Sequence, residues 1–355
     1  MPTILSDVVF RDELRDYMQV NTAEKTAFFQ SGILVNNSDM STLLASPSNT
    51  FTIPWWVDLD ASIESNYSND VYTDIAVPLS VNTSSMQART AYLNEGWSAM
   101  NLVKNITKQD PLEFVASRLT SYWQRVAQRR AIATVIGIYN DNVADNGGDM
   151  VVDAGGTISA AAIIRARATM GDYTPQIITP SGTKALSSIA MHSAVYTELQ
   201  ILNLIDYTPI ADQVPEFGRF QQMLVVIDDS MPIIPATEGD PDATPPVPAT
   251  PARYLSVIFG PGAFGYAEEQ DENDMAYERE EARGNGSGAE TLWTRRNFVL
   301  HPLGYSFLSN TITGTPGTTR PVSANWSDLA LASNWERKFN RKQVPLAFVT
   351  STVSA

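Results

Sequence analysis

The sequence contains no cysteine, which excludes disulfide bonds and cysteine-ligated metal sites. Its only two histidines, His192 and His301, stand alone, without the paired spacing of a zinc-binding motif. No apolar run reaches the 18 or more residues of a transmembrane helix, and residues 1–15 lack the apolar core of a signal peptide. We therefore expect no membrane partner, and synthesis in a cytoplasm-like compartment.

Basic residues are scarce, because 24 Lys and Arg face 39 Asp and Glu, and the net charge is −15 over 355 residues. Phosphate contacts need Lys and Arg, so the surface as a whole should not bind nucleic acid. The deficit is uneven: residues 1–100 hold 12 acids and 4 bases, whereas residues 283–355 hold 8 bases and 3 acids. One interpretation is that the acidic and the basic region form two solvated faces of the same subunit.

A sharper interpretation is that the acidic N-terminal region of one subunit lies on the basic C-terminal region of a neighbour, where complementary charge sets register and partner choice. The candidate intersubunit residues are Asp12, Asp16, Asp58, Glu64, Arg337, Lys338, Arg341 and Lys342.

One long helix is predicted from about Asp110 to Tyr139. Asp110 can cap it, Pro111 suits its first position, and apolar residues from Leu112 to Ile136 recur close to a 3.6-residue period. About 29 residues make a rod of roughly 43 Å. Such a helix in a chain with few others suggests a spine for strands and loops, and so a building block rather than an enzyme.

The segments around this helix differ in character. Residues 1–45 resemble an arm with a short amphipathic helix at Val8–Gln19, and residues 50–100 should form a long two-stranded excursion. Residues 140–156 should be a loop, and 235–252 an exposed Pro-rich loop. The strands expected for the excursion are Phe51–Val57 and Asp70–Val81. The region 157–285 should be α/β, with helices Ala160–Met170 and Ser181–Met191 and strands Gln176–Thr179, Gln222–Ile227 and Tyr254–Phe259. The last expected strands are Thr291–Leu300 and Gln343–Val349.

Two motifs match enzyme signatures without their context. Gly260–Gly265 fits G-x-G-x-x-G, but Pro261 removes an N–H and the following segment is acidic, so a tight turn is favoured over a nucleotide site. Ser181–Lys184 fits S-x-x-K, but the companion motifs of serine acyl-transfer enzymes are missing, which favours a helix cap. We therefore assign no catalytic, cofactor-binding or metal-ligating residue.

Several stretches are similar to the major capsid proteins of tailed bacteriophages, which have the HK97-type fold. They are Thr294–Gly304 (TRRNFVLHPLG), Trp335–Phe339, Gln343–Phe348 and Val257–Phe264. The order of arm, excursion, spine helix, α/β region and return strand also resembles this family. The resemblance implies an α+β fold. Its expected segments are an N-arm (1–45), an E-loop region (46–100), a P-domain with the spine helix (101–145), an A-domain (146–284), and P-domain return strands with a C-terminal segment (285–355).

The resemblance also implies a structural, non-enzymatic role. Subunits would form pentamers and hexamers of an icosahedral virion capsid, assembled in the bacterial host cytoplasm, that encloses double-stranded DNA without specific binding. Expected partners are a separate scaffolding protein and a portal protein, with a decoration protein as a further candidate. Residues 50–88 contain no lysine, so a lysine crosslink from the E-loop, as in the best-known member, is not expected.

Two alternatives stay open. An encapsulin-like nanocompartment shell uses the same fold and would need a pocket for a cargo peptide. A carbohydrate-binding or glycoside-cleaving phage protein would use some of the seven Trp residues, although core and interface positions are favoured for them.

Overall fold

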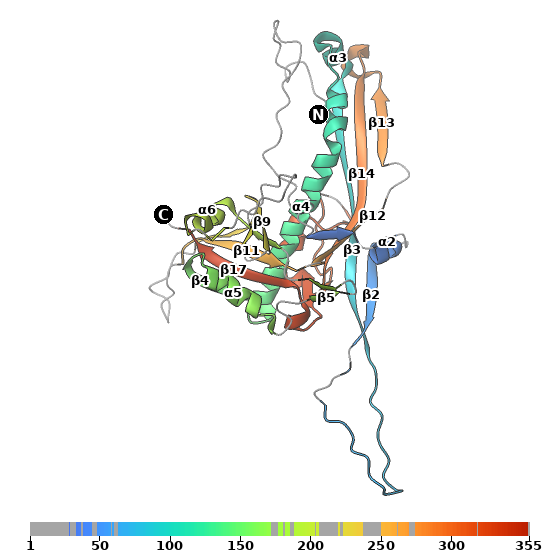
Figure 1. Cartoon of the computed structure of the whole chain (residues 1–355). Coiled ribbons are helices and arrows are strands. Elements are labelled where there is room, and N and C mark those ends of the chain that lie inside the picture. Colours follow the sequence, from blue (N-terminus) through green and yellow to red (C-terminus); the bar gives the residue numbers. More distant parts are fainter. Residues whose placement is uncertain are drawn as a thin grey trace, which may run out of the picture.

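The computed structural model describes an α+β chain built around one long helix and two large sheets (Figure 1). The described residues are 28, 33–36, 38–44, 48–57, 59, 63–171, 177–179, 182–184, 188–202, 204–205, 219–220, 223–236, 250–260, 262–269, 274–317 and 319–353. The predicted helix at Val8–Gln19 and most of the Pro-rich loop lie outside them.

The spine is α4 (Pro111–Asp145), whose 35 residues span about 52 Å. It begins as predicted, with Pro111 in the first turn and the Asp110 carboxylate accepting a hydrogen bond from Leu112 N at 3.0 Å. Its N-terminal half buries a single stripe that includes Leu112, Leu119 and Trp123, as an amphipathic helix should. From Ala127 onward it is buried on nearly every side, because this half passes through the main core.

A seven-stranded sheet forms the body on one side of α4. Alternate residues of its strands enter two different cores: Val257 and Phe259 pack with α4, whereas Ile258 packs on the other face. That other face is covered by α5 (Ala160–Ala168) and α6 (Ser193–Ile201). The strands, in spatial order, are β4 (Val151–Thr157), β17 (Leu346–Thr352), β11 (Arg253–Phe259), β7 (Ser188–Met191), β9 (Met223–Ile227) and β8 (Arg219–Phe220), with β10 (Ile233–Ile234) on β11.

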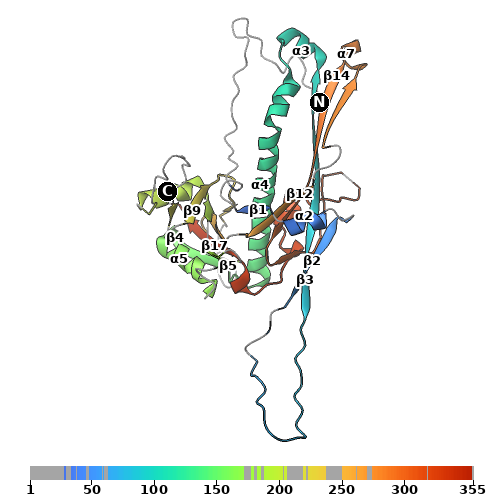
Figure 2. The same cartoon turned by 45° about the vertical axis from the view of Figure 1, so that its right-hand side comes forward.

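A six-stranded sheet lies against the other side of α4 and is built on two very long strands (Figure 2). Leu292 and Ala99 of these strands pack against Leu112 and Leu119, which holds the N-terminal half of α4 on the sheet. The spatial order is β1 (Leu34–Asn36), β12 (Phe264–Glu269), β14 (Ala289–Pro302), β3 (Thr83–Met100) and β2 (Thr50–Trp56), with β13 (Met275–Glu280) also on β14.

Short elements complete the described chain. A small two-stranded sheet and α8 (Trp326–Ala330) pack against α4 where Gly137 allows close approach: a Cβ there would overlap the Leu329 carbonyl and the Trp335 indole. The indole Nε1 donates to that same carbonyl oxygen at 2.7 Å. These elements are α2 (Ser38–Leu44), α3 (Asn101–Thr107), β5 (Ile177–Thr179), β6 (Gly182–Lys184), α7 (Arg283–Gly286), β15 (Tyr305–Phe307), α8 (Trp326–Ala330), η3 (Ala332–Asn334), β16 (Trp335–Arg337) and η4 (Arg341–Gln343).

Three expectations from the sequence are wrong. Residues 140–156 are not a loop, because α4 continues to Asp145 and β4 begins at Val151. The stretch Ser181–Met191 is not helical, since its described residues form β6 and β7. The stretch Asp70–Val81 is not a strand, because its backbone has no partner strand within the described part of the chain.

The five-segment division of the chain stays a prediction. The topology adds one fact to it: β12 and β13, which fall in the segment assigned to the A-domain (146–284), pair with β14 in the six-stranded sheet rather than joining the seven-stranded one.

Candidate assembly surfaces

The most prominent surface is an excursion between β2 and β3, residues 57–82, which projects from the body at the end opposite the start of α4 (Figures 1 and 2). Its base is closed by a hydrogen bond from Val57 N to Asn82 O at 2.9 Å. Its tip turns through Asn69–Asp74, where Asn69 Oδ1 accepts from Val71 N and Asn69 Nδ2 donates to Asp74. Every residue from 63 to 82 is exposed.

The excursion carries an apolar stripe, defined as Ile75, Val77, Leu79 and Val81. These side chains alternate with Ala76, Pro78 and Ser80, so an extended backbone presents them on one face. They are 88%, 76%, 74% and 56% exposed, respectively. The alternation at Ile75 and Val77 predicts a strand in this chain. The structure shows that it is instead a surface without cover from the described residues.

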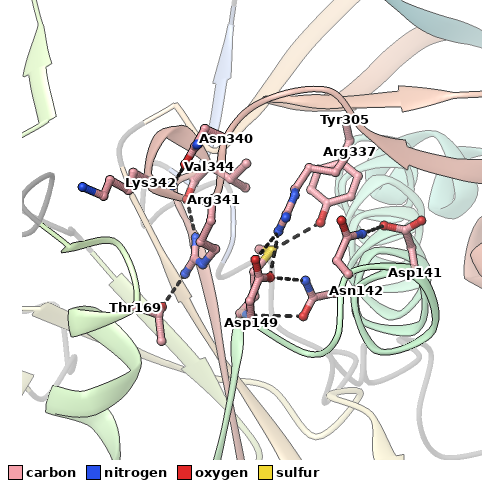
Figure 3. A network of polar contacts seen from close by, with 12 residues as sticks. Asp141, Asn142, Asp149, Thr169, Tyr305, Arg337, Asn340, Arg341, Lys342 and Val344 are labelled. Atoms are coloured by element: carbon pink, nitrogen blue, oxygen red, sulfur yellow. Dashed lines mark hydrogen bonds and ion pairs between the residues drawn. The ribbon is translucent and has the colours of Figure 1, made fainter. Parts of the chain in front are cut away.

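The basic candidate residues lie together in the segment β16–η4, but they already make contacts within the chain (Figure 3). Arg337 Nη1 donates to both carboxylate oxygens of Asp149, at 2.7 and 2.9 Å. Burial alone would raise the pKa of Asp149, but the hydrogen bonds from Arg337 and Asn142 hold it below its usual value. This pair ties the turn after α4 to the C-terminal segment.

Arg341 is buried, and burial lowers the pKa of its guanidinium to about 10. It donates to the Val344 carbonyl oxygen at 3.0 Å and to the Thr169 hydroxyl. Lys338 pairs with Glu336, two residues away on the surface. Arg341 and Arg337 therefore support this subunit's own fold.

Of the acidic candidates, only Glu64 is described. It is exposed on the excursion and accepts a hydrogen bond from the Tyr67 hydroxyl at 2.8 Å. Asp12, Asp16 and Asp58 lie outside the described residues. Among the described residues, Glu64 makes no contact with the basic candidates, and the intersubunit pairing stays a prediction.

The enzyme-like motifs have structural roles where they are described. Gly260 follows β11 and Gly262 has a positive φ of 71° in the turn that leads to β12, so the expected tight turn is confirmed and no helix follows it. Gly182–Lys184 is the strand β6 rather than the helix cap expected for S-x-x-K. In the described part of the chain, no three His, Asp or Glu side chains gather as metal ligands, and no helix is long and apolar enough to cross a membrane.

Comparison with known proteins adds to this geometry. No protein-family model matches the chain. It is 30% identical over 345 residues to the major capsid protein of Bacillus phage SPP1, and the match covers 96% of each chain.

Two solved structures with similar folds are capsid proteins, the cyanophage Pam1 capsid asymmetric unit and the capsid of Ralstonia phage GP4. Their TM-scores are 0.58 and 0.57, their identities 10% and 8%; the matches cover 99% and 86% of this chain and 98% and 94% of theirs. At such identities these matches show the fold alone, and it is the expected HK97-type fold. The relationship to the SPP1 protein extends over nearly the entire length of both sequences, and on that evidence the chain belongs to the family of tailed-bacteriophage major capsid proteins, with a structural role in the virion.

Proposed function

We propose that copies of this chain form the pentamers and hexamers of an icosahedral shell that encloses double-stranded DNA, and that the protein has no enzymatic activity. The observation that carries the proposal is the excursion with its apolar stripe. It lies away from both main cores, and it presents four apolar side chains that the described part of its own subunit leaves in solvent.

Burial of this stripe on a neighbouring copy would stabilise the contact. Full burial of one such side chain contributes roughly 1.5–3 kcal/mol, before the loss of chain entropy is subtracted. In the described part of the chain no strand pairs with residues 75–81, and their backbone would gain partners in such a contact. The four side chains together can therefore make a substantial contribution to one subunit contact, while a shell needs many further contacts.

Charge indicates what the receiving surface should be. Residues 57–82 contain five acids and no Lys or Arg, so the neighbour should offer an apolar surface with basic residues around it. The overall charge of −15 also disfavours tight binding to the enclosed DNA, which must leave the shell again.

The proposed charge pairs between Asp12, Asp16, Asp58 or Glu64 and the C-terminal basic residues belong to this model. Lys338 is the best of the basic residues to test, because its partner Glu336 is on the surface and its charge can be reversed without opening the core. As partners we propose a separate scaffolding protein, a portal protein and a decoration protein, with assembly in the bacterial host cytoplasm.

The test replaces the four stripe residues by serine. The matched control changes the opposite face of the same segment, with Ala76→Ser and Ser80→Asn. Both variants should keep the wild-type melting temperature, because neither side of this segment enters the described cores. Light scattering and negative-stain microscopy should show shells or capsomers for the wild type and the control, and unassembled subunits for the stripe variant.

Normal shells from the stripe variant would refute the role of the stripe. A wild-type protein that stays monomeric, alone and with the products of neighbouring genes, would refute the shell itself and favour the carbohydrate-binding alternative. A shell that captures a peptide-tagged cargo enzyme, with no portal or terminase gene nearby, would favour the nanocompartment.

A further inference from the structure

The connection between β13 and β14 contains one of the two Asn–Gly pairs in the sequence, Asn285–Gly286; the other is Asn146–Gly147, at the end of α4. An Asn–Gly pair can lose ammonia without an enzyme, because glycine has no side chain to shield its backbone nitrogen from the neighbouring carboxamide. In a folded protein the reaction also depends on how firmly the asparagine is held. The two pairs differ strongly in this respect.

Asn285 lies on the surface in α7, at the far end of the β13–β14 hairpin (Figure 2). α7 has four residues, and none of them is buried. Gly284 and Asn285 have φ values of 62° and 55°, outside the helical range. The Asn285 carboxamide makes no hydrogen bond to any of the described residues. A short exposed segment of this kind opens locally at little cost in free energy.

Asn146 is held by both its side chain and its backbone. Its Nδ2 donates to Asp141 Oδ2 at 3.1 Å, and its backbone N–H donates to the Asn142 carbonyl oxygen at 3.2 Å. The Gly148 N–H donates to the same carbonyl oxygen at 2.9 Å, which fixes the turn on the other side of Gly147. Asp141 and Asn142 are themselves buried. Rotation of the Asn146 carboxamide toward the Gly147 nitrogen would break its contact with Asp141.

We propose that Asn285 is a site of spontaneous deamidation in the folded subunit, and that the fold protects Asn146. The Gly286 backbone nitrogen loses its proton and forms a bond to Asn285 Cγ, the Cγ–Nδ2 bond breaks, and ammonia leaves. Water then opens the resulting succinimide at either carbonyl carbon, which gives aspartate or isoaspartate. The attack requires rotation about the Asn285 ψ, now 42°, and the glycines on both sides make that rotation easy.

The reaction would add one carboxylate to the end of the hairpin. The acids already there have basic partners, since Glu280 pairs with Arg283 and Glu281 pairs with Arg279. The new charge at position 285 would therefore make the end of the hairpin more acidic with time. Neither main core would change, because α7 buries no residue. The inference concerns a single subunit and does not depend on the proposed mode of assembly.

The first test compares the two pairs in folded and unfolded protein. Unassembled subunits are incubated at mildly alkaline pH, in buffer and in urea, and peptide mass spectrometry measures the replacement of NH2 by OH at each asparagine. In urea both pairs should react at similar rates, because only the local sequence then matters. In buffer Asn285 should keep most of this rate, and Asn146 should react many-fold more slowly. An unreactive Asn285, or equal rates at the two sites in buffer, would overturn the proposal.

The second test identifies the route. Enzymatic methylation of isoaspartate should label position 285 in aged wild-type subunits, because only the succinimide gives isoaspartate. Asn285→Gln is the matched control: it keeps the carboxamide, but its longer side chain closes the ring far more slowly, so it should stay unlabelled. Its melting temperature should equal that of the wild type, since the side chain is exposed. A product that contains aspartate alone, or equal labelling of the glutamine variant, would refute the proposed route.

Discussion

The buried imidazole of His301 should make the free energy of unfolding of this subunit fall as the pH falls. Burial lowers the pKa of its imidazole to about 4, whereas the same side chain in the unfolded chain titrates near 6.5. Between these values the unfolded state binds more protons than the folded state. The neutral ring therefore makes its full contribution to the free energy of unfolding above about pH 6.5. This contribution is lost as the pH falls toward 4.

The magnitude follows from the two pKa values. Each unit of separation corresponds to about 1.4 kcal/mol, so the contribution lost is about 2 kcal/mol at pH 5 and about 3 kcal/mol at pH 4. Asp141 has the opposite effect on stability. Burial and the neighbouring Asp145 raise its pKa to about 6, so as the pH falls the folded state takes up this proton before the unfolded state does. A pH profile of the wild type alone would mix these effects.

The assay therefore compares wild type with His301→Gln, which keeps a polar side chain but does not titrate. Urea unfolding of unassembled subunits, followed by circular dichroism at pH 7, 6 and 5, gives the free energy of unfolding of each. The variant should be less stable at pH 7, because it disturbs the buried site. Relative to the variant, the wild type should lose about 2 kcal/mol between pH 7 and pH 5.

Parallel pH profiles of the two proteins would refute the reasoning, because the buried ring would then titrate as it does in the unfolded chain. A wild type that gains stability relative to the variant as the pH falls would also refute it. That outcome would mean that His301 is protonated in the folded protein and has a negatively charged partner.

Two further substitutions test contacts that hold the spine to the C-terminal segment. Gly137→Ala should lower the free energy of unfolding by about 1–3 kcal/mol, since its methyl group would overlap the Leu329 carbonyl. Unchanged urea unfolding would contradict this prediction and would show that α8 can move away from α4 at little cost. Arg337→Glu should destabilise the subunit by about 1–3 kcal/mol, because it faces Asp149, whereas Lys338→Glu should change stability by less than about 1 kcal/mol. Equal melting temperatures for these last two variants would contradict the structural role of the Arg337 pair.

The beginning of α4 could be predicted from sequence and its end could not, for a physical reason. The Asp110–Pro111 start depends on local capping, which a short window of sequence contains. The end lies in the core, where Asn140 Nδ2 donates to the Ala330 carbonyl oxygen and Asn142 bonds Asp149 and the Met150 N–H. In the sequence these polar residues resemble a loop, because the partners that satisfy them come from distant segments.

Of the strands in the seven-stranded sheet, some could be predicted from the sequence and others could not. Val257–Phe259 was recognisable because a buried strand in a two-sided core is apolar throughout. Ser188–Met191 is equally buried, yet a serine followed by three apolar residues does not distinguish a strand from a helix. The polar network around Arg337 was also missed. Its residues were chosen for their charge, whereas their partners become visible only when the turn after α4 meets the C-terminal segment.

The alternation at Ile75 and Val77 correctly indicates an extended, exposed excursion, although residues 70–81 form no strand with any described residue. Alternation predicts that one face of an extended segment is covered, but it does not say which chain supplies the cover. Here the cores of the subunit are filled by other residues, and the stripe lies beyond β2 and β3 at the far end of the molecule. In the proposed shell, folding and association would therefore depend on separate residues. Substitutions in the stripe should change assembly without changing subunit stability, whereas Gly137 and His301 should do the reverse.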